Sequence, residues 1–315
     1  MRPQMRPPTR PLRGISFKIA SVLVFIVMAA LIKATARHVP PGEAVFFRSL
    51  FAIPVIVAWL SYRRELSSGL KTVQPMGHVW RGVVGTTAMG LGFAGLGYLP
   101  LPEVTAIGYA APLLTVIFAA MFLGEQVRAF RITAVALGLV GVLIVLSPRL
   151  TSLRDGQVAT AEALGAMLVL GGAVFAALAQ VFVRKLVLTE QTSAIVFWFS
   201  ATATMLSLVT LPFGWVMPAP REALMLVAAG LLGGVGQILL TSSYREADAS
   251  VVAPFEYVSM LFALGFGYFI FNEVPTLTML FGASLVVIAG ILIIWRERQL
   301  GLERARQRKA MTPQG

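Results

Sequence analysis

The sequence predicts an all-α integral membrane protein whose ten transmembrane helices form two inverted five-helix repeats. Composition is one observation behind this prediction: 57% of the 315 residues are hydrophobic and only 13% are charged, whereas soluble domains carry about 25% charged residues. The mean hydropathy is +0.81. Two further observations, an internal duplication and a series of long apolar segments, give the arrangement and the number of the helices.

An internal repeat divides the chain into halves of ~150 residues. Val45–Ser49 (VFFRS) recurs 151 positions later as Val196–Ser200 (VFWFS), and at the same offset Lys33 corresponds to Arg184. Each half holds five apolar segments. Because five crossings are an odd number, the second half enters the bilayer from the side opposite to the first. Inverted repeats of this kind are typical of transporters.

Ten apolar segments are long enough to cross a bilayer core of roughly 30 Å, which takes about 20 residues of helix. They are 15–36, 43–62, 79–99, 103–123 and 131–147 in the first half, and 163–186, 193–213, 223–244, 250–271 and 276–295 in the second. Arginines precede the first segment, as basic residues do in a signal peptide. That segment is too long for a signal peptide and lacks a small-residue cleavage site, so we expect it to remain as the first helix.

The remaining segments are short, and the basic residues sort by side of the membrane. We expect a cytoplasmic basic tail at 1–13, a first repeat at 14–147, a periplasmic linker at 148–162, a second repeat at 163–296 and a cytoplasmic basic tail at 297–315. In this arrangement 20 of the 26 lysines and arginines lie in cytoplasmic segments and 5 lie in periplasmic ones. The positive-inside rule therefore predicts an inner-membrane protein with both termini in the cytoplasm.

Several chemical functions have no residues to support them. The chain has no cysteine, and His38 and His78 are far apart in predicted loops, so we expect no metal, no cofactor and no catalytic residues. The sequence contains no Walker motif for ATP, and its basic residues are not gathered into a nucleic-acid-binding domain. Gly90–Gly95 fits the pattern GxGxxG. It lies inside an apolar segment with no preceding strand, so close helix packing explains it better than dinucleotide binding.

Glu256 is the strongest candidate for a substrate or proton site. It lies about two turns into the ninth apolar segment, where a lone carboxylate is costly unless it is protonated, paired or in contact with water. Pro254 can kink this helix just before Glu256 and Tyr257, and Tyr109 occupies the position equivalent to Glu256 in the first half. We expect Tyr109, Glu256 and Tyr257 to bind substrate, with proton coupling through Glu256. A hydrogen bond to a neighbouring helix is the structural alternative for this carboxylate.

Arg48 and Trp198 are further substrate-binding candidates. Arg48 lies within the second apolar segment, and Trp198 lies deep in the seventh. A buried cation favours an anionic or zwitterionic substrate, and an indole ring can stack on a planar one. Both have simpler explanations, because long basic side chains snorkel to the membrane surface and aromatic rings pack against lipid or other helices. Snorkelling also explains Lys33, near the end of the first segment. The second half has Phe199 in place of Arg48, so the shared fold does not require this arginine.

Two stretches carry a resemblance to a known family: RGVVGTTAMGLGFAGLGYLPLPEVTAIGYAAPLLTVIFAAMFLGEQV at 81–127 and APFEYVSMLFALGFGYFIFNEV at 253–274. With them, nearly the whole of 14–298 resembles the EamA family of the drug/metabolite transporter superfamily. The resemblance implies a central cavity formed mainly by the third, fourth, eighth and ninth helices, with contributions from the first and sixth. The chain departs from the pattern at two positions: Met260 stands where the first half has Pro112, and Asn272 replaces the usual glycine before Glu273.

The predicted function is that of an inner-membrane secondary transporter that moves a small metabolite by alternating access. Members of the resembled family carry amino acids, sugars, vitamins, nucleotides and other metabolites, so the resemblance implies a small-molecule substrate. The expected partners are this substrate and the lipid bilayer, without nucleic acid, and the expected assembly is a monomer or a homodimer. The alternatives are an integral-membrane enzyme acting on a lipid or isoprenoid substrate and a sensory or scaffold membrane protein. The sequence lacks the clustered acids and histidines of the first and the soluble domain of the second.

Overall fold

A computed structural model of the protein describes residues 10–123, 129–151, 157–247 and 249–311, and all of their regular structure is helical. The first half contains α1 (Pro11–Thr35), α2 (Pro41–Tyr62), α3 (Leu66–Gly69), α4 (Pro75–Leu96), α5 (Leu101–Gly108), α6 (Ala110–Leu123) and α7 (Ala129–Thr151). The second half contains α8 (Gln157–Leu186), α9 (Thr192–Ser207), η2 (Leu208–Phe213), α10 (Pro220–Glu246), α11 (Ala249–Val252), η3 (Ala253–Tyr257), α12 (Val258–Phe271) and α13 (Leu277–Met311). The fold class predicted from the sequence is confirmed.

Prolines mark where several of these helices begin. Pro11, Pro41, Pro75 and Pro220 are the first residues of α1, α2, α4 and α10. Proline suits this position because its fixed φ matches the helix and its missing N–H would have no partner in the first turn. The sequence therefore shows where these four helices begin to within a few residues.

Nine helical segments in the described part of the chain are long and apolar enough to cross a membrane. The tenth predicted span is α4, which has 22 residues but is less apolar because it contains Arg81, Thr86 and Thr87. Many large apolar side chains elsewhere are exposed, among them Met167 and Phe269. Lipid covers such side chains in a membrane protein. Together with the long apolar helices, these exposed side chains identify the chain as a multi-pass membrane protein.

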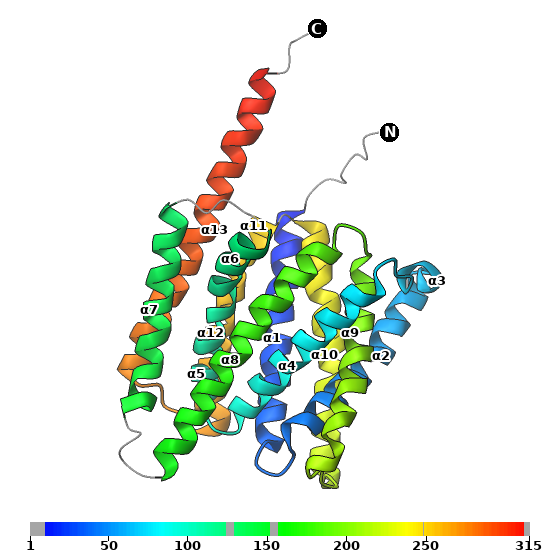
Figure 1. Cartoon of the computed structure of the whole chain (residues 1–315), viewed down its shortest axis with the longest axis vertical. Helices are drawn as coiled ribbons and strands as arrows, with labels where there is room; N and C mark the ends of the chain where they lie inside the picture. Colours follow the sequence, from blue (N-terminus) through cyan, green and yellow to red (C-terminus); the bar gives the residue numbers. More distant parts are fainter. Residues whose placement is uncertain (1–9, 124–128, 152–156, 248, 312–315) are drawn as a thin grey trace.

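The two halves run in opposite directions. In Figure 1, α1 starts at the end of the molecule where α13 finishes, which we call the terminal end, and runs to the opposite, far end. Its counterpart α8 starts at the far end and runs back. The two halves exchange packing partners. α1 packs along α10, and their counterparts α8 and α4 pack along each other in the same way. α2 packs along its own counterpart α9, and α7 packs along its own counterpart α13. Such exchange indicates a pseudo-twofold axis between inverted halves.

The fourth and ninth spans are both interrupted. Tyr109 separates α5 from α6, and η3 separates α11 from α12. Pro112 follows the first interruption and Pro254 lies at the start of the second, where a proline removes a helical hydrogen bond. Pro54, by contrast, lies inside the continuous helix α2. The sequence predicted spans over 103–123 and 250–271 with a kink at Pro254, and the structure replaces the kink by the 3-10 segment η3 and adds the interruption at Tyr109.

Glycines let helices of the two halves approach closely. A Cβ atom on Gly95 would lie 2.1 Å from the side chain of Val169. Cβ atoms on Gly230 and Gly234 would lie 2.8 and 3.1 Å from backbone carbonyl oxygens of α2. The interpretation of Gly90–Gly95 as a packing motif holds at Gly95. Gly90 and Gly92, in contrast, have no neighbouring atom within 4 Å of a Cβ position.

The helices extend into the predicted linker and tail. Residues 148–151 belong to α7 and 157–162 to α8, while 152–156 lie outside the described residues. α13 continues through 297–311. Of the predicted tails, 1–9 and 312–315 also lie outside the described residues.

Candidate functional site

The two interrupted spans meet through a pair of tyrosines. The rings of Tyr109 and Tyr257 lie 5.0 Å apart at an interplanar angle of 66°, and both residues are buried. The Tyr109 hydroxyl is hydrogen-bonded to the Ser259 hydroxyl, which in turn donates to the Glu256 carbonyl at 2.7 Å. Residues from equivalent interruptions in the two halves can touch only where the pseudo-twofold axis passes between them.

Glu256, next to this tyrosine pair, forms an ion pair with Lys18 of α1. The lysine side chain is 2% exposed and the glutamate side chain is 51% exposed. The lysine ammonium also lies 5.7 Å from the centre of the Tyr244 ring. The sequence placed Glu256 inside a helix, where its carboxylate would need a proton, a partner or water, and the structure gives it a partner but changes two details. Glu256 belongs to the 3-10 segment η3, and the deeply buried charge is that of its partner.

Lys18 is a site residue that sequence reasoning missed. It is one of the 20 basic residues assigned to cytoplasmic segments, whereas the structure buries it among α1, α10 and η3. The available signal was its position inside the apolar segment 15–36. A lysine at that depth needs a partner because an unpaired buried ammonium is costly.

Arg48 of α2 and Arg81 of α4 both approach the ring of Phe199 of α9. Their Cζ atoms are 5.9 Å and 3.5 Å from the centre of the Phe199 ring. Arg48 is 4% exposed. In the described chain the Nε and Nη1 atoms of both arginines are buried without a hydrogen-bond partner. Arg48 therefore does not snorkel. Arg81, one of the 20 basic residues assigned to cytoplasmic segments, points its guanidinium into the protein.

Trp198 has a backbone partner outside this group. Its indole N–H donates to the Leu70 carbonyl at 3.0 Å, just after the short helix α3. The structure thus brings together Tyr109, Glu256 and Tyr257, and it gives Trp198 a bond that fixes a loop. A role of Trp198 in substrate binding stays a prediction.

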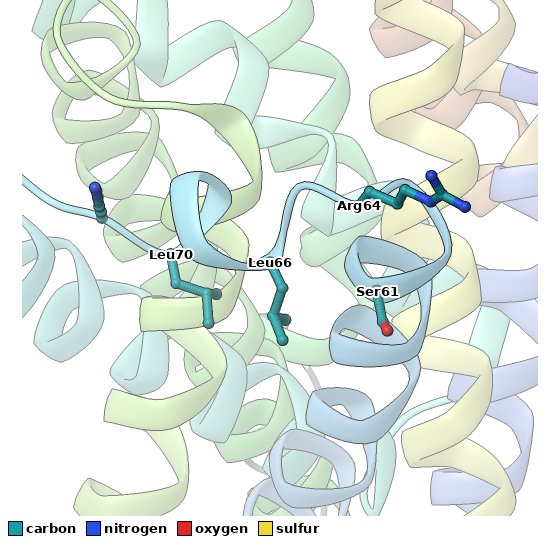
Figure 2. A pocket seen from close by; sticks show the side chains of 5 residues that line it. Ser61, Arg64, Leu66 and Leu70 are labelled. Carbon is teal, nitrogen blue, oxygen red and sulfur yellow. The ribbon is translucent and has the colours of Figure 1, made fainter.

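A pocket lies near that loop at the terminal end (Figure 2). It has a volume of about 660 Å³ and is lined by Ser61, Arg64, Leu66, Leu70 and Lys71. A second pocket, of about 280 Å³, opens at the far end between α1, α2 and α4 and includes Phe93 and Tyr98. Neither of these two pockets is lined by a predicted substrate-binding residue.

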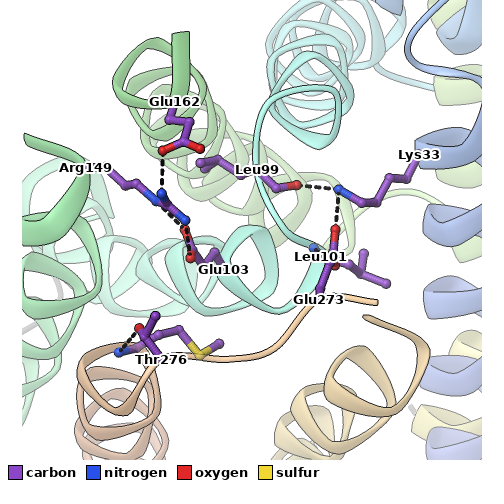
Figure 3. Close-up of polar contacts among 9 residues, drawn as sticks. Lys33, Leu99, Leu101, Glu103, Arg149, Glu162, Glu273 and Thr276 are labelled. Carbon is purple, nitrogen blue, oxygen red and sulfur yellow. Dashed lines mark hydrogen bonds and ion pairs between the residues drawn. The ribbon is translucent and has the colours of Figure 1, made fainter. Parts of the chain in front are cut away.

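Ion pairs join the two halves at the far end (Figure 3). Lys33 of α1 pairs with Glu273 at 2.9 Å and donates to the Leu99 carbonyl at 2.5 Å. Glu273 also accepts a hydrogen bond at 2.8 Å from the backbone N–H of Leu101, the first residue of α5. Lys33 was expected to snorkel to the membrane surface, and it has instead a specific partner in the other half, Glu273.

A second connection lies beside the first in Figure 3. The Arg149 guanidinium binds Glu103 of α5 in a two-pronged arrangement, at 3.0 Å from Nε and 2.8 Å from Nη2. It also binds Glu162 of α8. Bidentate arginine–carboxylate pairs are among the stronger and more directional polar contacts. Arg149 therefore ties the start of α5 to the other half at this end.

Two buried glutamates hold the loops that precede α4 and its counterpart α10. At the terminal end, Glu190 accepts hydrogen bonds from the backbone N–H groups of Val73 and Gln74, both at 2.7 Å, and from the Thr72 hydroxyl at 2.9 Å. At the far end, Glu43 accepts from the N–H of Val216 at 3.1 Å. Each glutamate belongs to the half opposite to the loop that it holds.

The environment of Glu190 favours its charged form. Burial by itself would raise the pKa of this carboxyl, but the hydrogen bonds from Gln74, Thr72 and Val73 and the nearby His78 together lower it below its ordinary value. His78 Nε2 lies 3.7 Å from the carboxylate. His78 belongs to the first turn of α4, so its predicted position in a loop is corrected.

Comparison with known proteins supports the internal repeat and places the chain. The EamA-like transporter family matches residues 12–147 and again 163–296. The pseudopaline exporter CntI of Pseudomonas aeruginosa is 31% identical over 284 residues, 89% of this chain and 95% of the exporter. The S-adenosylmethionine uptake transporter of Rickettsia prowazekii is 27% identical over 91% of this chain and 94% of that protein. A solved crystal structure with 20% identity covers 90% of the chain and 98% of its own, with a TM-score of 0.64. This chain belongs to the EamA-like transporter family.

Proposed function

We propose that this chain is an inner-membrane secondary transporter that moves a small organic metabolite by alternating access of its two inverted halves. One observation carries the proposal: the interrupted fourth and ninth spans meet at the pseudo-twofold axis through Tyr109 and Tyr257. Interrupted helices at the interface of inverted repeats are where transporters of this architecture hold their substrates.

Open space beside the same spans supports a cavity there. On Gly90 of α4, Gly108 of α5 and Gly265 of α12, a Cβ atom would meet no atom within 4 Å other than those of the adjoining turns of its own helix. These helices form the third, fourth and ninth spans, to which the resemblance assigned the cavity. Tyr109, Tyr257 and Glu256 from the adjoining interruptions would then line it, with Arg48 deeper in the bundle.

Relatives favour transport over the alternative of lipid or isoprenoid chemistry. The named relatives are transporters, one an exporter of pseudopaline and others uptake systems for S-adenosylmethionine. Both cargoes are small organic metabolites by name, and they travel in opposite directions. We carry over to this chain only the class of cargo.

Without Lys18 and Arg81, which the structure turns into the protein, 18 of the 20 basic residues assigned to the cytoplasm remain against 5 periplasmic ones. This bias assigns the terminal end to the cytoplasm. The far end is then periplasmic, and the connections made by Lys33 and Arg149 close it. An outward-open state must separate Lys33 from Glu273 and Arg149 from Glu162. These contacts are the proposed periplasmic gate.

Proton coupling through the Glu256–Lys18 pair is part of the proposal. Protonation of the half-exposed Glu256 would release the buried Lys18 from its partner and change the balance between conformations.

The measurement begins by comparing metabolites inside and outside cells that lack or overexpress the chain, which identifies the cargo. Transport of that cargo is then followed in vesicles at a series of pH values.

Glu256→Gln keeps the shape of the side chain but removes its titration, so we expect transport by this variant to lose its pH dependence. Glu65→Gln, at an exposed pair with Arg63, is the matched control and should keep it. Unchanged pH dependence in Glu256→Gln would remove Glu256 from the coupling mechanism. Identical metabolite profiles in the two strains would contradict the transport of a metabolite.

A further inference from the structure

Two unpaired cations lie together inside the bundle. Arg48 reaches Phe199 from α2 and Arg81 reaches it from α4, with Cζ atoms 5.9 and 3.5 Å from the ring centre. Arg48 is 4% exposed, and among the residues that the structure describes neither arginine has an ion-pair or hydrogen-bond partner for its buried Nε and Nη1 atoms. Four donor nitrogens are therefore buried without an acceptor.

Such an arrangement is unfavourable unless something negative joins it. A buried guanidinium loses its water and regains stability only through an anion and well-aligned hydrogen bonds. Two guanidiniums around one ring add mutual repulsion to that cost. The contact with the ring face offsets part of it, but a phenyl ring does not accept the hydrogen bonds of four N–H donors.

The neighbouring helices leave room for these side chains. A Cβ atom on Gly233 of α10 would lie 3.2 Å from Nε of Arg48, and one on Gly85 of α4 would lie 2.9 Å from the Phe199 ring and 3.2 Å from Nη1 of Arg81. Any larger residue at either glycine would press on a guanidinium or on the ring. The space around the pair is thus formed by three helices besides α2.

The position of the pair fits a site reached from both sides. Arg48 lies about two turns into α2 from the far end, and Arg81 about two turns into α4 from the terminal end. Phe199 occupies in the second half the position of Arg48 in the first. The ring and its two arginines therefore lie where the two halves face each other.

We propose that Arg48 and Arg81 bind a carboxylate or phosphate group of the transported metabolite, beside the ring of Phe199, which makes the cargo an organic anion or zwitterion. The fork of N–H groups on arginine matches the oxygens of carboxylate and phosphate and binds them in pairs. The identity of this group rests on the proposed transport function, but its binding can be measured without transport.

The test uses the purified full chain in nanodiscs of phosphatidylcholine, with its thermal unfolding followed as solutes are added. The probes are succinate, inorganic phosphate and, as uncharged and cationic controls, succinamide and choline. Succinate or phosphate should raise the unfolding temperature and the controls should not. Arg48→Met and Arg81→Met should each raise the anion concentration needed for this stabilisation at least about tenfold. Arg221→Gln, at an exposed arginine, should leave that concentration unchanged.

Stability without ligand distinguishes binding from a structural role. Because each methionine variant removes a buried, unpaired charge, it should unfold at the same temperature as the natural chain or at a higher one when no anion is present. Lower stability of both variants, together with an unchanged response to anions, would overturn the proposal. Equal stabilisation by succinamide or choline would also overturn it.

A lipid headgroup could supply the same chemistry, and a second set of nanodiscs separates the two sources. If phosphatidylglycerol stabilises the chain through Arg48 and Arg81 while succinate and phosphate do nothing in phosphatidylcholine, the pair is a lipid site and the proposal is wrong. Anion binding with no transport would instead contradict the proposed function and leave the site in place.

Discussion

The Lys18–Glu256 pair combines a buried cation with a half-exposed anion, so its two members contribute unequally to stability. Removing the carboxylate leaves an ammonium buried without a partner, whereas removing the ammonium leaves a carboxylate that other surroundings can solvate. From the sequence alone, Glu256 would be the buried charge, and its removal would be the less damaging of the two changes. The structure predicts the opposite, because Lys18 is the buried member of the pair.

We expect Glu256→Gln to lower the free energy of unfolding by about 1–3 kcal/mol and Lys18→Met to lower it by less. The double variant should recover most of the loss, because neither charge then remains. Unfolding in mixed micelles, or thermal unfolding in nanodiscs, measures all three. Equal losses in the two single variants, simply added in the double, would show that the pair is not an interacting unit.

Single residues were the part of the site that the sequence predicted least well. It identified Tyr109, Tyr257 and Glu256 as neighbours because the repeat aligns them, and the structure places Tyr109 against Tyr257. It did not identify Lys18 or Arg81. A basic residue near a helix end looks the same in the sequence whether it snorkels outward or turns inward, since only packing against other helices decides its direction.

Helices and their boundaries were predicted more accurately. The length of the apolar segments and the positions of the prolines were sufficient to locate the helices. The thickness of the bilayer sets how long a spanning helix must be, and proline, which lacks an N–H, favours the first position of a helix. The interruptions at Tyr109 and in η3 were not predicted as breaks, although Pro254 indicated a kink in the ninth span. A proline inside a span has two outcomes, as the continuous helix around Pro54 shows.

The loop before α4 gives a prediction at the scale of an element. Glu190 holds Val73 and Gln74 through backbone N–H groups, and these bonds lower the pKa of its carboxyl, against the effect of burial. A lowered pKa in the folded state means stability that is fully present above the ordinary glutamate pKa. That stability is lost as the pH falls through the lowered value.

We therefore expect Glu190→Gln to cost about 1–3 kcal/mol at neutral pH and to flatten the dependence of stability on pH in the acidic range. Thermal unfolding between neutral pH and acidic pH checks this, with Glu65→Gln as the exposed control. A natural chain whose acid sensitivity equals that of Glu190→Gln would contradict the role given to this carboxylate.

The whole molecule combines a symmetric scaffold with asymmetric chemistry. Helices exchange packing partners across the pseudo-twofold axis, yet Lys18 corresponds to Val169, and Arg48 to Phe199. The duplication predicted the scaffold because packing between helices repeats with the sequence. The charges of Lys18 and Arg48 occur in only one copy, so the repeat carries no information about what these two residues contact.

Alternating access is the central claim, and one labelling experiment tests it most directly. The chain contains no cysteine, so Ser259→Cys, beside the Tyr109 hydroxyl, introduces one thiol at the axis. An impermeant maleimide is applied to right-side-out cells and to everted vesicles. Arg37→Cys and Arg63→Cys, exposed at the far and terminal ends, report periplasmic and cytoplasmic access. Combining Ser259→Cys with Lys33→Cys and Glu273→Cys, joined by a bifunctional maleimide, locks the proposed periplasmic gate.

The account predicts that the thiol at position 259 reacts from both sides in the unlocked protein. Once the gate is locked, it should react only from the cytoplasmic side. Reaction from a single side in both proteins, or from both sides after the lock, would contradict alternating access by the two halves.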